Sequence, residues 1–192
     1  MALASIHVAL LRAVNVGSKR KVPMADLIGV FEDAGAESAK TYIQSGNVLF
    51  RPPSGKKGST ASLATFIRTV EAALLARFGF AIPVVVRTQA DLVRIVRDNP
   101  FLARGLPPEK LHLGFLGHAP AEERVARFDT SRSPGDEAVI SGAELYLHMP
   151  NGVGNSKLTT PWLEKSLGTT VTVRNWRTVT ALAALATAAA SG

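Results

Sequence analysis

Two basic, glycine-containing segments carry the residues with the clearest chemistry. The first runs from Arg12 to Lys21 and the second from Asn151 to Lys157. Glycine allows the backbone to turn its N–H groups toward a ligand, and lysine or arginine supplies positive charge. The start of a following helix adds the positive end of its dipole. Both segments therefore have the composition of an anion-binding loop.

The candidate binding residues come from these segments and from two shorter motifs. Gln44-Ser45-Gly46-Asn47 has the residues of a turn, to which Gln44 adds a long amide. Arg174 leaves the last predicted strand, and its guanidinium is suited to a bidentate grip on phosphate or carboxylate. The predicted ligand-binding residues are Arg12, Asn15, Gly17, Lys19, Lys21, Gln44, Ser45, Asn47, Ser156, Lys157 and Arg174.

Each motif also has a purely structural explanation. The first segment is equally a long solvated loop, and Ser45-Gly46-Asn47 is ordinary turn chemistry that needs no ligand. The second segment lacks the Gly-x-x-x-x-Gly-Lys-Ser/Thr spacing of a nucleotide-binding P-loop. An anion site is therefore a hypothesis that the positions of these residues in space must support.

Signatures of catalysis are weak. The four histidines show no metal-binding spacing, and acidic residues avoid the glycine loops, which leaves Mg²⁺ without evident ligands. Zero cysteines exclude disulfides, thiolate catalysis and cysteine-ligated zinc or Fe–S centres. We predict no metal and no cofactor, and of the four histidines we retain only His148, near the second segment, as a candidate acid or base.

Composition limits the class of partner. A net charge of +7 and a pI near 10.1 permit association with phosphorylated metabolites, nucleic acid or acidic partners. Aromatic residues make up only 6% of the chain and no RNP1 pattern is present, so nucleic acid would be bound through its backbone. No apolar run reaches the ~20 residues of a membrane span and no basic leader precedes the first strand, which predicts a cytoplasmic protein. The oligomeric state is left open.

The pattern of apolar residues and turn signals predicts a mixed α+β chain. The first half is predicted to contain strand Ile6–Leu11, a helix from Met24 that ends at Gly35, a hairpin about Gly46-Asn47 with strands Thr41–Ser45 and Val48–Arg51, helix Ser62–Phe78 and strand Ile82–Arg87. This β-α-β-β-α-β order is that of a ferredoxin-like, split β-α-β unit.

The second half repeats this order after a connecting helix over Ala90–Arg97. Its predicted elements are strand Lys110–Leu116, helix Ala121–Phe128, hairpin strands Glu137–Ile140 and Leu145–His148, helix Thr160–Leu167, strand Val171–Val173 and a final helix Asn175–Ala189. We therefore predict two ferredoxin-like halves, residues 1–88 and 89–192, packed as one compact unit. The second half includes the connecting helix and the C-terminal helix.

Several strings are distinctive when taken together. They are Leu10 to Met24, Thr41 to Phe50, Gly154 to Leu158, and Arg174-Asn175-Trp176. On these strings the chain closely resembles the DUF1697 family over nearly its whole length. The resemblance implies a small bacterial α+β protein with two ferredoxin-like repeats, and it implies no activity. The chain has Ser18 where the family often has glycine, and Ala13-Val14-Asn15 where it often has Gly-Ile-Asn.

The leading hypothesis is a protein that binds a phosphorylated or otherwise anionic small molecule through its basic loops. Three alternatives remain: a metal-independent enzyme that uses His148 or Lys157 as proton carrier, a backbone-directed nucleic-acid binder, and a protein-interaction module with an apolar surface on the alanine-rich final helix.

Overall fold

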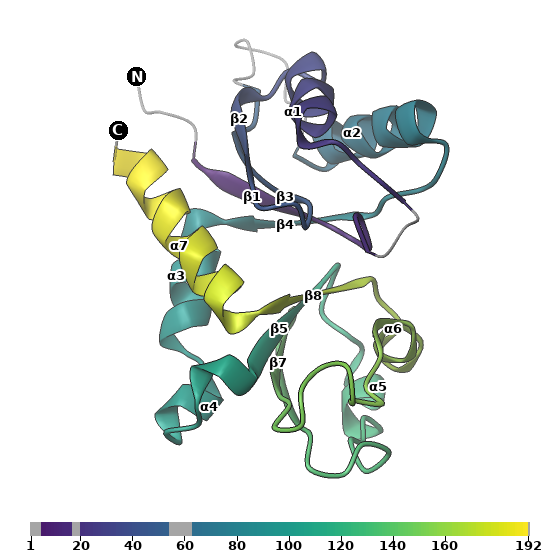
Figure 1. Cartoon of the computed structure of the whole chain (residues 1–192), viewed down its shortest axis with the longest axis vertical. Helices are drawn as coiled ribbons and strands as arrows, with labels where there is room; N and C mark the ends of the chain where they lie inside the picture. Colours follow the sequence, from purple (N-terminus) through teal and green to yellow (C-terminus); the bar gives the residue numbers. More distant parts are fainter. Residues whose placement is uncertain (1–4, 17–19, 54–62, 192) are drawn as a thin grey trace. The chain divides into compact units, whose positions relative to one another are not determined.

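The computed structural model describes residues 5–16, 20–53 and 63–191, and the chain divides into two compact units. The first unit is formed by the chain up to Asp91 together with the residues from Ala184 onward, and the second by Leu92–Ala183. Figure 1 shows the elements of both units, coloured along the chain. The predicted boundary between residues 88 and 89 stays a prediction. The last turns of the C-terminal helix, from Ala184 onward, pack in the first unit and not in the second.

The first unit contains an antiparallel sheet with strand order β2-β3-β1-β4. The strands are β1 (His7–Leu11), β2 (Glu37–Tyr42), β3 (Asn47–Arg51) and β4 (Val84–Thr88). All five residues of β1 are buried, and β1 lies inside the sheet, paired with β3 on one side and β4 on the other. The edge strand β2 both starts and ends earlier than the predicted Thr41–Ser45, because residues 43–46 form the turn. The polar residues Glu37, Ser38 and Lys40 and a register shift hide its β pattern in the sequence.

Helices α1 (Met24–Asp33) and α2 (Leu63–Phe78) cover one face of this sheet, as Figure 1 shows. Alternate sheet residues such as Val48 and Phe50 point toward them. Phe50 lies at the centre of an aromatic group, with its ring centroid 5.3 Å from both Phe31 of α1 and Phe66 of α2. The helical spacing of apolar residues in the sequence therefore corresponds to this buried layer.

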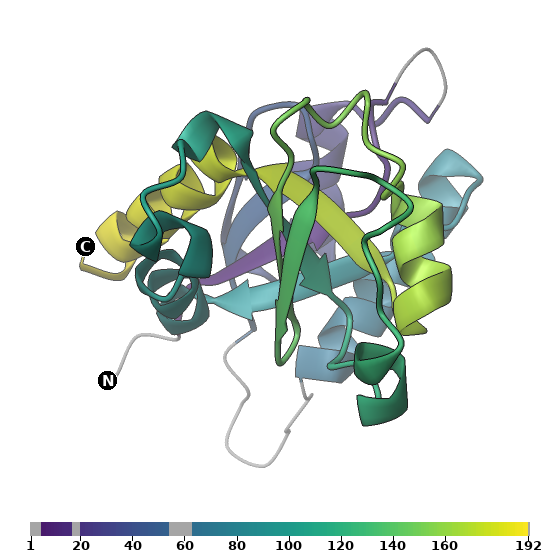
Figure 2. The same cartoon turned by 90° about the horizontal axis from the view of Figure 1, so that it is seen from below.

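The second unit repeats the arrangement with strand order β6-β7-β5-β8, again antiparallel. The strands are β5 (Leu111–Leu116), β6 (Glu137–Ser141), β7 (Glu144–His148) and β8 (Val171–Asn175), and the helices are α5 (Glu122–Ala126) and α6 (Thr160–Leu167). Figure 2 shows α5 and α6 on the same side of these strands. The second core includes Leu163 and Leu167 of α6 against Leu145, Leu147 and Val171 of the sheet.

Three further helices and one short turn of 3-10 helix connect or complete the units. They are α3 (Gln89–Arg97), α4 (Pro100–Ala103), a 3-10 helix over Pro108–Lys110 and α7 (Trp176–Ser191). The sequence pattern did not predict α4, which starts where Asn99 Oδ1 accepts hydrogen bonds from the N–H groups of Phe101 and Leu102. Asn175 similarly starts α7, because its Oδ1 accepts from Thr178 N at 2.8 Å.

Gly46, at the tip between β2 and β3, permits a close approach that fixes one end of the first sheet. Its carbonyl accepts a hydrogen bond from Leu11 N at 2.8 Å, and its φ of +71° lies in the left-handed region. A Cβ at this position would overlap Val14 Cγ2 and lie 2.9 Å from Leu11 Cβ. Only glycine satisfies both the conformation and the space.

Tyr146 on β7 shows what burial does to an ionisable group in the second unit. Its side chain is 2% exposed, and its hydroxyl donates to the carbonyl of Ile95 at 3.4 Å. Burial, followed by the nearby negative charge of Glu144, raises the pKa of Tyr146 to about 12.

Replacing Gly46 with alanine should destabilise the protein, whereas Gly29→Ala should not. Gly29 lies within α1 with nothing within 4 Å of an added Cβ, so alanine there should add ~0.5–1 kcal/mol of stability. Gly46→Ala combines overlap with left-handed strain and should remove about 2 kcal/mol or more. Urea unfolding of both variants measures the difference. Equal stabilities would contradict the close packing at Gly46.

Ionisation of Tyr146 should occur near pH 12 in the folded protein. The chain has two tyrosines, so Tyr42→Phe leaves Tyr146 as the one reporter in a near-ultraviolet absorbance titration. The folded state holds the phenolic proton above the unfolded pKa of about 10, and stability should therefore fall as pH rises from about 10 toward 12. A folded-state midpoint near the unfolded value would show that the phenol is not buried.

Candidate functional site

Those predicted binding residues of the first half that the structure describes gather at one end of the first sheet. The loop that follows β1 meets the β2–β3 tip there, and the side-chain amide of Asn15 joins the two. Its Nδ2 donates to the carbonyls of Val22 at 3.0 Å and Gln44 at 2.8 Å, while its Oδ1 accepts from Val22 N at 2.8 Å. Asn15 therefore closes the loop on itself and anchors it to the tip.

Asn47 and Ser45 close the tip in the same manner. Asn47 is fully buried, and its Nδ2 donates to the carbonyl of Tyr42 at 3.1 Å and to Ser45 Oγ at 2.8 Å. Burial of an amide is stable only when its polar atoms are paired, as they are here. The polar atoms of Asn15, Ser45 and Asn47 thus form hydrogen bonds within the protein, and these bonds stabilise the surrounding loops.

Backbone strain concentrates at this loop pair. Among the described residues, five non-glycine residues have positive φ, and four of them are Ala13, Asn15, Arg20 and Ile43. A left-handed conformation costs an ordinary residue roughly 1–2 kcal/mol, and asparagine somewhat less. The Asn15 hydrogen bonds hold the loop in this conformation. Strain of this kind often gathers at ligand-binding surfaces.

The charges around the loop pair differ in their surroundings. Arg12 is half-buried, and Lys21 and Gln44 are exposed. Arg20, which was not a predicted ligand, lies 4.8 Å from the centroid of the Phe80 ring and donates to the carbonyl of Ala81. Gly17 and Lys19 lie outside the described residues. The described surface therefore has the charges of Arg12 and Lys21 and the exposed amide of Gln44 around the loop pair.

The second predicted loop is held by a buried serine and aspartate. Lys157 N donates to Ser133 Oγ at 2.9 Å, and the Ser133 hydroxyl donates to Asp136 Oδ2 at 2.7 Å. Ser156 Oγ accepts from Leu158 N at 3.0 Å, so its hydroxyl helps to shape the turn. The Lys157 side chain is exposed. This loop presents a cation on a fixed backbone within the second unit.

Arg174 is buried in β8. It is 9% exposed, and its Nη1 donates to Thr172 Oγ1 at 2.7 Å and to the carbonyl of Val173 at 3.0 Å. Burial lowers the pKa of its guanidinium to about 10. Val173 packs against the core that contains Leu158, so strand alternation points Arg174 to the opposite face of the sheet.

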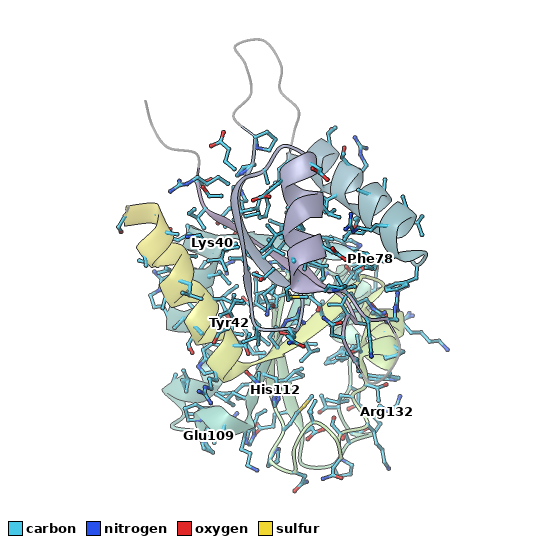
Figure 3. All side chains as sticks on the ribbon, turned by 45° about the horizontal axis from the view of Figure 1, so that its top comes forward. Lys40, Tyr42, Phe78, Glu109, His112 and Arg132 are labelled. Carbon is cyan, nitrogen blue, oxygen red and sulfur yellow. The ribbon has the colours of Figure 1, made fainter. Side chains whose placement is uncertain are left out.

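An arginine-rich cavity in the second unit was not predicted. It has a volume of about 360 Å³, and Arg124, Arg127, Arg132, Phe128 and Trp162 are among the residues that line it. Arg132, labelled in Figure 3, lies 4.7 Å from the centroid of the Trp162 ring, close enough for a cation–π contact. In the sequence, the only signal of this cavity was the presence of three arginines between positions 124 and 132, around the end of a predicted helix.

The guanidinium of Arg124 is hydrogen-bonded to the C-terminal end of α6. Its Nη1 donates to the carbonyls of Lys165 at 3.0 Å and Ser166 at 3.1 Å, which complements the negative end of that helix. Gly168, with φ of +69°, leaves room for this guanidinium, because an added Cβ would lie 2.6 Å from Arg124 Nε. Arg124 therefore has a structural role, and Arg127 and Arg132 supply the remaining positive charge of the cavity.

His148, the candidate acid or base, is held by a carboxylate. Its Nδ1 lies 2.9 Å from Glu137 Oε1, and Arg104 Nη1 lies 2.7 Å from Glu137 Oε2. The hydrogen bond from Arg104, followed by that from His148, holds the pKa of Glu137 below its ordinary value. A carboxylate that orients one ring nitrogen is a common feature of acid–base histidines.

A family model described as a protein of unknown function, DUF1697, matches residues 5–146. The chain belongs to the DUF1697 family. Its fold is similar to that of a conserved bacterial protein from Streptococcus pneumoniae, with a TM-score of 0.67 and 18% sequence identity over 95% of this chain and 98% of that one. No curated protein sequence matches the chain.

Within residues 5–16, 20–53 and 63–191, no group of three or more histidine, aspartate or glutamate side chains is placed to hold a metal ion. In the same ranges, no helix has the length and apolar character needed to cross a membrane.

Asn15→Ala should loosen both loops of the first unit. The variant removes three hydrogen bonds and places alanine at a φ of 55°, so we expect a loss of about 2 kcal/mol. The matched control is Asn155→Ala, which removes one exposed hydrogen bond to Asn151 and should cost less than about 0.5 kcal/mol. Denaturant unfolding of both variants measures the loss.

Asn15→Gly separates strain from hydrogen bonding. Glycine adopts the left-handed conformation freely but lacks the amide, so this variant should still be less stable than the parent chain. Parent-like stability of Asn15→Gly would show that the three hydrogen bonds do not hold the loop.

Proposed function

We propose that this DUF1697 protein binds a phosphorylated or otherwise anionic small molecule at the end of the first sheet, where the β1–α1 loop meets the β2–β3 tip. The observation that carries the proposal is the Asn15 amide, which ties two strained loops into one fixed surface. A fixed surface loses little entropy when a small ligand binds, so its charges act at full effect.

Different residues have different parts in this proposal. Arg12 and Lys21 supply positive charge and Gln44 an exposed amide, while Asn15, Ser45 and Asn47 hold these groups in place. Gly17 and Lys19 belong to the same loop in the sequence and stay predicted members of the site. Ser156, Lys157 and Arg174 remain a second predicted set, and we assign them no contact with the first.

The finer description of the fold is also a proposal. We infer that each half is a ferredoxin-like unit, with the predicted boundaries 1–88 and 89–192. The strand orders β2-β3-β1-β4 and β6-β7-β5-β8 support this, because each split β-α-β unit places its third strand between the first and second. The bacterial origin of the structural neighbour and the absence of cysteine favour a bacterial, cytoplasmic protein.

A second candidate function is metal-independent acid–base chemistry on an anionic substrate at His148. The observation that favours it is the Glu137 carboxylate, which fixes one nitrogen of the imidazole. Proton transfer by the other nitrogen would require a substrate beside β7. The variant His148→Gln, measured by thermal unfolding with the same ligands, tests this candidate.

The test is thermal unfolding of the whole chain with orthophosphate, pyrophosphate, ribose 5-phosphate, AMP and a short RNA. A ligand at 100 times its Kd stabilises a protein by about 2.7 kcal/mol, or about 5–10 °C in Tm for a chain of this size. We expect one small anion to give this rise, and the double variant Arg12→Ala/Lys21→Ala to abolish it. Arg127→Ala/Arg132→Ala is the matched control, because it removes two arginines from the second unit.

The controls define the outcomes that contradict the proposal. Loss of the rise in Arg127→Ala/Arg132→Ala alone would move the site to the arginine-rich cavity, and loss in His148→Gln alone would favour the acid–base candidate. Stabilisation by RNA alone, weakened steeply by salt, would indicate nucleic-acid binding. If no ligand of the series raised the Tm, the proposal that the loop surface binds a small anion would be contradicted.

A further inference from the structure

A cavity of about 530 Å³ lies within the first unit, between the sheet and the last turns of α7. Its sheet wall includes Lys40 and Tyr42 of β2 and Leu49 of β3, and its helix wall is Leu185, Ala188 and Ala189. In Figure 3, Lys40 and Tyr42 lie on the side of β2 that is next to α7. None of the residues that form the loop surface described above lines this cavity.

The cavity exists because the helix wall is made of small side chains. Residues 185, 188 and 189 follow the i, i+3, i+4 spacing of one helix face, and two of the three are alanine. Alanine is too short to fill the space above Leu49. Leu185, the one large apolar side chain of these three residues, is 41% exposed.

Two polar contacts hold α7 against the first unit and so keep the walls in place. Arg51 Nη2 donates to the carbonyl of Ala189 at 2.7 Å, and Gln89 Nε2 donates to Thr187 Oγ1 at 3.1 Å. These bonds fix the last turns of the helix at a distance that its alanines do not bridge. The cavity is therefore a built feature of the unit.

The lining combines an apolar floor with a basic rim. Ile6 and Leu49, both buried, form the floor, and Lys40 and Arg51 are the two cations among the described residues of the rim. No aspartate or glutamate is among the described residues that line the cavity. A volume of this size with a mostly apolar lining and few polar groups is typical of small-molecule sites.

We propose that this cavity binds a medium-chain carboxylate. The apolar chain would lie on Ile6, Leu49 and Leu185, and the carboxylate would accept a charge-assisted hydrogen bond from the Lys40 ammonium. Tyr42, two residues along the same strand, adds a hydroxyl donor to the same face. The charge of Arg51 strengthens the preference for an anion while its Nη2 holds the helix.

The experiment is a titration of the whole isotope-labelled chain with decanoate, followed by amide chemical shifts. We expect saturable shifts that centre on Ser38, Lys40, Ala188 and Ala189. Decan-1-ol, which has the same tail and no charge, should bind at least tenfold more weakly. Equal binding of the alcohol, or shifts that centre elsewhere, would overturn the proposal.

Two variants with matched controls identify the site. Lys40→Ala should raise the Kd for decanoate about tenfold, the loss expected for one charge-assisted hydrogen bond, while Lys165→Ala on the second unit should leave it unchanged. Ala188→Phe should fill the cavity and abolish binding, whereas Ala190→Phe, exposed on the same helix and outside the lining, should not. Unchanged affinity in both Lys40→Ala and Ala188→Phe would place the ligand outside this cavity.

Discussion

The first unit depends on one side-chain amide placed between two loops that are distant in sequence. Asn15 supplies two donated bonds and one accepted bond, and Gly46 permits the close approach that brings the β2–β3 tip against Leu11 and Val14. Without the amide, the backbone groups of Val22 and Gln44 would lose their partners, and the left-handed residues nearby would have nothing to hold them. Both loops are therefore ordered by the same interaction, and any ligand surface that they share depends on it.

The second unit repeats the strand order but anchors its loop by different chemistry. Its basic loop lies at a different connection, after the third strand β7 and before α6, and is held there by Ser133 and Asp136, which are buried and reach the backbone of Lys157. Arg124 adds a bond to the last carbonyls of α6. The arrangement of strands is thus compatible with unrelated loop anchors, because the sheet is stabilised by its own core and the loops lie outside it.

The elements of the sheet and core were predictable because their signals are local. The apolar run of β1 and the helical spacing in α1 and α2 depend on residues close in sequence. Gly46 was also a local turn signal, although the turn covers residues 43–46 and Asn47 begins β3. The roles of the polar residues could not be predicted in this way. The sequence does not show whether the side-chain amide of an asparagine binds a ligand or, as Asn15 does, a backbone carbonyl 29 residues away. Arg132 and Trp162 likewise meet only through the fold, and Arg174 is buried by strand alternation that its neighbours determine.

The alanine-rich end of the chain illustrates how a weak signal becomes a specific feature. In the sequence, the run from Ala181 to Ala190 indicates only the last turns of a surface helix. Against a sheet that presents Leu49, Lys40 and Tyr42, the same small side chains leave a cavity with charge at its edge. Larger residues at 188 and 189 would fill that volume and gain stability from the burial. With alanine at both positions, apolar surface of the cavity stays unburied. The apolar chain of a bound ligand would bury this surface and so stabilise the folded protein.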